Sequence, residues 1–221
     1  MQQPIADGSR GCRIRVALCL AIVACLLPTT GAVAARTVCQ LVKDRADDAN
    51  DVEPFTRGQS DPSLDIRSVD VATSPRLLTV VVRVTNLAFR NPAELRLPRY
   101  SASFVHRERT FEVNAYRGPD GEFFDISTSQ NSDTSGVLIS SQTATGVFDE
   151  SKSEVRVTAP LAAIEVDGKI DPAERLTELG AMSWRDVGSY GSTPYAGTTL
   201  DTTSRSGTYR FHVRSCVTPG R

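Results

Sequence analysis

The chain has 221 residues, of which 40% are hydrophobic, and its 25 basic and 26 acidic residues give a formal net charge of −1 at pH 7. This balance argues against a protein that binds nucleic acid or an anionic membrane surface, because both need a strongly basic face. The length suits a short leader followed by one domain of β-sandwich size.

The N-terminal residues have the features of a secretory signal peptide. Three arginines precede an apolar run over residues 16–27, and small residues at 32–34 supply a cleavage pattern. The apolar run is too short for a membrane span of the mature chain. We therefore expect a signal peptide over residues 1–35, a single β-sandwich domain over residues 36–221, and secretion of the product.

A lipid anchor is the alternative form of export. Residues 22–25, Ile-Val-Ala-Cys, fit a lipoprotein box that would leave the mature chain lipidated at Cys25. However, Leu26 and Leu27 continue the apolar run where a polar tether would be expected. The sequence therefore favours soluble export over an anchored lipoprotein.

Two cysteines remain after the leader, Cys39 and Cys216, one near each end of the mature chain. In an oxidising compartment such a pair predicts a disulfide that ties the terminal strands together. In the chain-entropy model, closing so long a loop stabilises the fold by up to about 5 kcal/mol. The alternatives are two buried free thiols or a metal site, for which zinc would need nearby histidines.

The mature chain begins with a short strand over residues 36–43 and continues into an acidic loop. Calcium prefers about six to eight oxygen ligands, and a loop rich in carboxylates can offer them. The spacing does not match an EF-hand, and the alternative is a solvated acidic loop. The candidate calcium ligands are Asp44, Asp47, Asp48, Asn50 and Asp51.

The most regular part of the sequence is residues 63–87, which predicts a β-hairpin. Residues 78, 80, 82 and 84 are all Leu or Val, so one face of the second strand is wholly apolar. In the first strand the apolar parity changes between Ile66 and Val69, which indicates a β-bulge near Arg67. Residues 72–75 contain the turn, because Pro and small polar residues interrupt strands.

Alternating apolar and polar residues predict further short strands along the rest of the chain. Residues 159–164 instead predict one helical turn, since a proline opens a run of Leu, Ala and Ile. Residues 186–206, rich in Gly, Ser, Thr and Tyr, read as a long loop. The expected strands are 100–106, 110–116, 122–127, 137–141, 145–148, 154–158 and 209–216.

Many short strands, Gly and Pro turns and almost no helical periodicity predict an all-β fold. We expect an immunoglobulin-like, jelly-roll-like antiparallel β-sandwich with one short helical turn. The order of Asp61–Ile66, the Val-rich strand and the later motifs Tyr100–Phe104, Gly146–Phe148 and 159–164 resembles the DOMON-type and family 9 carbohydrate-binding-module-like sandwich of exported bacterial proteins. The resemblance covers residues 38–216.

This resemblance implies a ligand such as a sugar, haem or calcium. The sugar-binding members use stacked tryptophans, whereas this chain has a single one, Trp184. With Tyr190 and Tyr195 it could form an aromatic platform for a sugar, and the alternative for Trp184 is a core position. Haem-binding members use axial Met and His, for which the candidates are Met182, His106 and His212. We expect both histidines on polar or mixed strand faces, as half-buried structural residues.

No nucleophile elbow, HExxH, P-loop or dinucleotide-binding pattern is present in the sequence. The sequence therefore favours a non-catalytic binding module whose ligand is a glycan or a protein at the cell surface. The alternatives are a structural accessory domain without a ligand and a small extracellular haem- or metal-binding protein.

Overall fold

The computed structural model describes residues 39–46, 49–51, 61–88, 98–118, 121–130, 137–166, 168, 170–185 and 199–220. The predicted signal peptide and its cysteine Cys25 lie outside these residues. The described chain belongs to one compact unit, Ala35–Arg221. It contains thirteen strands and a single 3-10 turn, so the expected all-β sandwich is confirmed. None of the described residues forms a helix that is long and apolar enough to cross a membrane.

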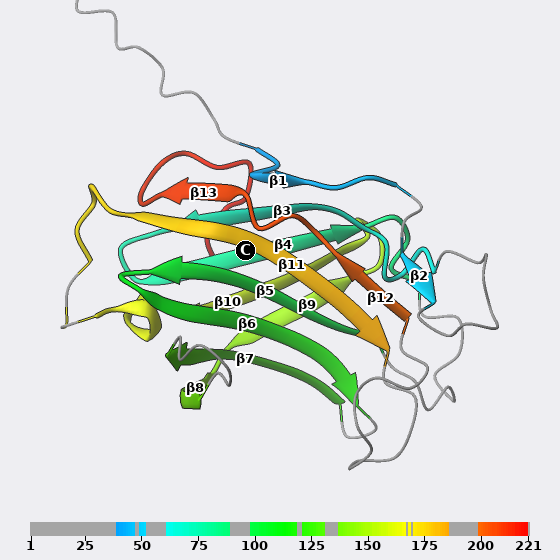
Figure 1. Ribbon diagram of the computed structural model, residues 1–221, viewed down its shortest axis with the longest axis horizontal. Helices are drawn as coiled ribbons and strands as arrows, with labels where there is room; N and C mark the ends of the chain where they lie inside the picture. Colours follow the sequence, from blue (N-terminus) through cyan, green and yellow to red (C-terminus); the bar gives the residue numbers. More distant parts are fainter. Residues whose placement is uncertain are drawn as a thin grey trace, which may run out of the picture. The chain divides into compact units, whose positions relative to one another are not determined.

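The smaller sheet has five antiparallel strands, and its order is not the order of the sequence (Figure 1). Both strands of the predicted hairpin lie in it, and the hairpin pairs on one side with the first strand and on the other with β10. In spatial order the strands are β1 (Val42–Lys43), β3 (Ile66–Thr73), β4 (Leu77–Val84), β10 (Glu154–Pro160) and β9 (Thr145–Asp149).

The larger, eight-stranded sheet packs against the smaller one and is also antiparallel. Its eighth strand, β13 (Gly207–Arg210), pairs with the first half of β11. The other seven, in spatial order, are β2 (Asn50–Asp51), β12 (Thr199–Thr202), β11 (Arg175–Arg185), β5 (Pro98–His106), β6 (Arg109–Gly118), β7 (Gly121–Gln130) and β8 (Val137–Thr143).

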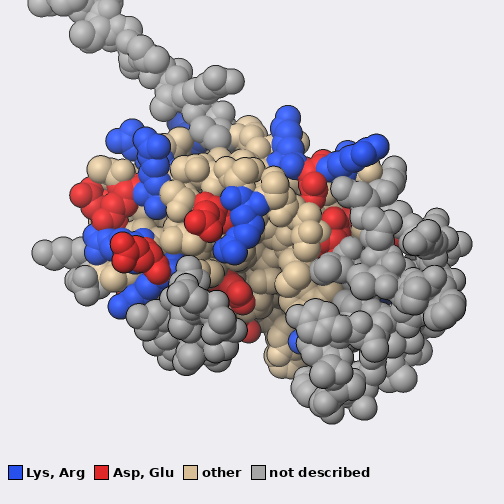
Figure 2. Space-filling view, viewed as in Figure 1, with Lys and Arg blue, Asp and Glu red and all other residues tan. Residues whose placement is uncertain are grey.

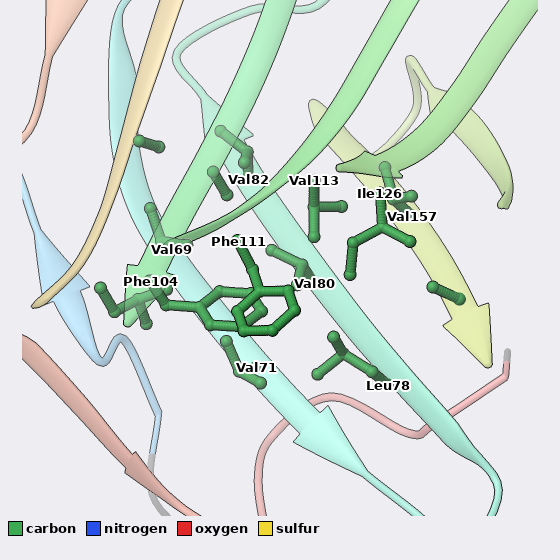
Figure 3. Close-up of a cluster of buried hydrophobic side chains, with 14 of the residues drawn as sticks. Val69, Val71, Leu78, Val80, Val82, Phe104, Phe111, Val113, Ile126 and Val157 are labelled. Carbon is green, nitrogen blue, oxygen red and sulfur yellow. The ribbon is translucent and has the colours of Figure 1, made fainter. Parts of the chain in front are cut away.

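The hairpin of β3 and β4 follows the sequence pattern closely. The register shifts by one residue between Ile66 and Ser68, which confirms the predicted bulge. Leu78, Val80 and Val82 are all buried and point into the space between the sheets, as Figure 3 shows. Alternation along a strand therefore sets which side chains form the core.

Aromatic side chains of the larger sheet fill the facing half of the core. Phe104 of β5 and Phe111 of β6 stack with ring centroids 5.7 Å apart, and both lie among the valines of the smaller sheet in Figure 3. The predicted helical turn is present as the 3-10 turn Leu161–Ile164, directly after Pro160. It is fixed to the hairpin turn, where the amide of Leu161 donates to the carbonyl oxygen of Arg76 over 2.8 Å.

The predicted loop over residues 186–206 is wrong in part, because β12 lies within it. Asp201 of this strand is buried, and its Oδ2 accepts a hydrogen bond from the amide of Ile66 over 2.6 Å. Because Asp201 and Ile66 are 135 positions apart in the sequence, no local pattern predicts this contact. The predicted last strand is also too long, since β13 ends at Arg210 and a turn follows in which His212 has a φ of 58°.

The predicted disulfide between Cys39 and Cys216 is confirmed, with 5.2 Å between the two Cα atoms. Past Cys216 the chain covers the outer face of the smaller sheet, which the sequence did not indicate. Val217 packs on Ala72 and Val81, and the amide of Gly220 donates to Oγ1 of Thr79 over 3.0 Å. This cover explains why the mixed face of β4 is buried as well as its apolar face.

Candidate functional site

The strand registers of the larger sheet align four large side chains across neighbouring strands. Trp184 of β11 lies opposite Arg99 of β5, Arg99 lies opposite Tyr116 of β6, and Tyr116 lies opposite Phe123 of β7. We call these four residues the aromatic row. The sequence indicated only Trp184, because nothing in it shows that β11 pairs with β5.

The aromatic row lies on the outer face of the sheet. Successive residues of a strand point to opposite faces, and the residues next to the row, Tyr100, Ala115 and Ser183, are buried on the inner side. The side chain of Phe123 is 37% exposed. The row is therefore on the face that solvent can reach and does not belong to the core.

Two contacts hold the middle of the row in place. The guanidinium carbon of Arg99 lies 5.0 Å from the ring centroid of Tyr116. On the side of β7, the ring of Phe123 stacks on Tyr116 with centroids 4.9 Å apart and planes at 13°. Because β6 lies between β5 and β7, Tyr116 is held between a cation and a second ring. Each such contact contributes about 0.5–1 kcal/mol at an exposed site.

A second row of residues, which we call the polar row, runs beside the aromatic row on the same face, two residues away from it in each strand. Met182, Ser101, Asn114 and Asp125 lie opposite one another across β11, β5, β6 and β7. Nδ2 of Asn114 donates to Oδ1 of Asp125 over 2.9 Å, and Met182 is 38% exposed. The face therefore offers hydrogen-bonding groups next to rings.

Charged side chains lie together at the other end of this face. Figure 2 shows basic and acidic groups together over the end where β11 begins and where the β5–β6 turn lies. There Arg107 pairs with Glu174 at 2.6 Å. The aromatic row lies at the opposite end, where β5 begins and β11 ends.

The end of β11 beside the aromatic row is fixed to the core by a polar cluster. Arg185 donates from Nε to Oδ2 of Asp61 over 2.7 Å and from a terminal nitrogen to Oγ of Ser63 over 2.6 Å. Burial raises the pKa of Asp61, but the hydrogen bonds from Ser63 and the charge of Arg185 outweigh burial and lower it. Tyr100 donates its hydroxyl to the carbonyl oxygen of Ser63 over 2.6 Å, and burial raises the pKa of this tyrosine.

The other two residues of the predicted sugar platform, Tyr190 and Tyr195, lie outside the described residues. Trp184 lies on the outer face of the larger sheet and is partly buried, and the sugar platform stays a prediction. Tyr116 and Phe123 are the aromatic partners that the sequence did not single out. Their alternation as strand residues was visible, but not their position beside Trp184.

The predicted calcium ligands are only partly described. Asp44 follows β1, and its Oδ1 accepts the amide of Arg45 over 2.9 Å. Asn50 and Asp51 form β2, whose backbone pairs with β12 and so extends the sheet that carries the aromatic row. Asp47 and Asp48 lie outside the described residues. Within the part of the chain that the structure describes, no three His, Cys, Asp or Glu residues form a metal-binding group, and calcium remains a prediction.

The expectation for His106 is wrong, because this side chain lies on the inner face of β5 and is 1% exposed. Its parity is that of Tyr100 and Phe104. Nδ1 donates to the carbonyl oxygen of Ile164 over 2.9 Å, and Nε2 lies 2.9 Å from Oε2 of Glu174. His106 can be buried because both of its ring nitrogens have a polar partner, the carbonyl oxygen of Ile164 and the carboxylate of Glu174.

The haem alternative requires a methionine and a histidine on one iron. Met182 lies on the outer face of the larger sheet, whereas His106 lies on the inner face among the core aromatics. These two side chains are therefore on opposite sides of one sheet. His212 is exposed in the turn after β13.

No protein-family model, curated protein or solved structure matches the chain. The resemblance to the DOMON-type and family 9 carbohydrate-binding-module-like sandwich therefore stays a prediction from the sequence.

Proposed function

We propose that this protein is an exported, non-catalytic module that binds a glycan on the outer face of its larger sheet. The observation that carries the proposal is the alignment of Trp184, Arg99, Tyr116 and Phe123 across four neighbouring strands. Rings on an exposed sheet face offer apolar surface to the C–H faces of sugars.

The row also has the spacing and rigidity that a linear glycan needs. Neighbouring strands lie about 4.8 Å apart, which is roughly the length of one sugar ring. Trp184 and Phe123 are three strand spacings apart, roughly 14 Å, so a linear glycan lying across the strands would span both. Because Tyr116 is held between Arg99 and Phe123, both faces of its ring are covered, and sugar stacking falls to Trp184 and Phe123. The same contacts fix the side chains of the row, so little side-chain freedom is lost when a ligand binds.

The polar row would supply the hydrogen bonds that give such a site its specificity. Sugar hydroxyls both donate and accept, and Asn114 and Asp125, which are only partly buried, offer both kinds of group next to the rings. Binding sites commonly combine an apolar surface with a few such polar groups.

The disulfide supports the export part of the proposal. Disulfides persist in oxidising compartments and are rare where thiols are kept reduced. The Cys39–Cys216 bond therefore agrees with the signal peptide that we predict over residues 1–35.

A protein ligand is the second candidate, and the composition of the same row favours it. Trp, Tyr and Arg contribute most of the binding energy in many protein interfaces. In that case the row would be the centre of an interface, and no glycan would be retained.

The proposal is tested by a glycan array with the purified protein, followed by calorimetric titration of the strongest soluble glycan. We expect the variants F123A and W184A to bind about tenfold more weakly, which corresponds to about 1.4 kcal/mol for each lost ring. The matched control is V147A, since Val147 is an exposed apolar residue of the smaller sheet. Retention of no glycan, or equal affinity in all three variants, would contradict the proposal.

A further inference from the structure

A second candidate site lies where the two sheets meet at the edge formed by β1 and β13. These strands lie side by side in Figure 1, and a Cβ added to Gly207 would meet Cγ2 of Val42 at 2.5 Å. Next to this contact the surface contains a pocket with a volume of about 220 Å³. It is lined by Leu41, Arg175, Thr208, Tyr209, Arg210 and Val213.

Two of the lining residues carry the same charge and lie directly opposite each other. Arg175 of β11 is in register with Arg210 of β13, and both are exposed. Like charges at such positions repel each other and destabilise a sheet. Among the described residues neither guanidinium forms an ion pair. The register therefore places two arginines side by side that no acidic residue of the described chain neutralises.

We propose that Arg175 and Arg210 form a binding site for a small organic anion. A guanidinium binds a carboxylate, sulfate or phosphate group through two parallel hydrogen bonds, and two guanidiniums can share one such group. Leu41 and Val213 provide an apolar wall for the body of the ligand. The volume lies below the roughly 300 Å³ at which pockets for drug-sized molecules begin, so the site suits a single small unit.

This site is separate from the aromatic row. Arg175 and Trp184 stand at the two ends of β11, which at about 3.3 Å per strand residue are roughly 30 Å apart. One small ligand cannot reach both. The inference therefore does not depend on the proposed glycan binding, and either can fail without the other.

The anionic group could belong to a free small acid or to an acidic sugar, and the probes distinguish these sources. Phosphate, butyrate, glucuronate and neutral glucose are each titrated into the full-length protein at constant ionic strength, with binding followed by NMR or calorimetry. Binding of glucuronate alone assigns an acidic sugar, and binding of butyrate or phosphate assigns a free anion. We set a dissociation constant of about 10 mM as the weakest useful affinity. If none of the three anions binds at this concentration, the proposal is overturned.

The variants R175Q and R210Q test the residues themselves. We expect each to weaken binding of the effective anion at least tenfold, while R76Q, an exposed arginine in the β3–β4 turn, binds like the unmodified protein. In the absence of anion and at low salt, R175Q should melt no lower than the unmodified protein, because it removes a repulsion; this shows that the variant is folded. Unchanged affinity in the double variant R175Q/R210Q would overturn the assignment.

Discussion

Arg83 of β4 forms an ion pair with Asp70 of β3, whose carboxylate is only 1% exposed. On its other side, Nε of Arg83 lies 3.4 Å from Oε2 of Glu154 on β10, which is also buried. Arg156 also pairs with Glu154, at 2.8 Å, so Arg83 is the cation paired with Asp70 and shares Glu154 with a second arginine.

Removal of Arg83 should therefore destabilise the protein strongly. We expect R83A to lower the free energy of unfolding by about 3 kcal/mol, because a buried carboxylate loses its cation. K152A is the matched control, since Lys152 is exposed and pairs with Asp149 at the surface; it should change the free energy of unfolding little. Urea unfolding followed by circular dichroism measures the stability of both variants. Equal losses of unfolding free energy would show that the buried ion pair contributes no more than an exposed one.

The Cys39–Cys216 disulfide closes a loop with a sequence separation of 177. In the chain-entropy model its removal lowers the free energy of unfolding by up to about 5 kcal/mol. The double variant C39A/C216A should therefore unfold at lower urea concentration and should not respond to reductant. The unmodified protein should approach the same midpoint once reduced. A midpoint that stays unchanged after complete reduction, checked by thiol titration, would contradict this expectation.

The C-terminal segment should contribute to stability like part of the core. Val217 is buried on Ala72 and Val81, so V217A should cost about 2 kcal/mol, from lost transfer energy and the cavity left behind. V147A removes the same atoms from a side chain that is 45% exposed and should cost little. Thermal unfolding of V217A and V147A tests this expectation. If the two variants have similar melting temperatures, the C-terminal segment does not contribute to stability like part of the core.

Acid should weaken the contact between Glu174 and the β5–β6 turn. Hydrogen bonds from Arg107, and then from His106, lower the pKa of Glu174 to about 2, from an ordinary value of 4.5. A carboxylate whose pKa is lower in the folded state stabilises the protein above the unfolded pKa, and this contribution is lost as the pH falls from about 4.5 to about 2.

The variant E174Q makes this loss measurable. The difference in unfolding free energy between the unmodified protein and E174Q should be present at pH 7 and should shrink towards zero near pH 2. E165Q, at an exposed glutamate after the 3-10 turn, is the control. A difference for E174Q that does not change between pH 7 and pH 2 would show that the ion pair is not formed in solution.

The sequence predicts the fold best where the pattern is local. The parity change between Ile66 and Val69 predicts a bulge, and the register has it there. Pairing between distant segments leaves no such pattern, so β2 and β12, which pair with each other, were missed. His106 was misplaced although its parity with Phe104 was visible, because a histidine is rarely fully buried without partners, and its partner Glu174 is 68 residues away.

The sequence singles out one residue of the candidate site but not the other three. Trp184 stood out as the single tryptophan, and a sugar platform was a reasonable hypothesis for it. Its row partners Arg99, Tyr116 and Phe123 come from three other strands, and only the strand order places them beside it. Composition alone therefore indicated the neighbouring Tyr190 and Tyr195 instead.

The most direct test of the aromatic row uses its own tryptophan as the reporter. Trp184 is the only tryptophan of the chain, so its emission spectrum reports on this face alone. On titration with a glycan selected by the array, we predict a saturable change in emission that persists in V147A and becomes about tenfold weaker in F123A. A glycan that binds by calorimetry without altering the emission of Trp184 would show that the ligand site lies elsewhere.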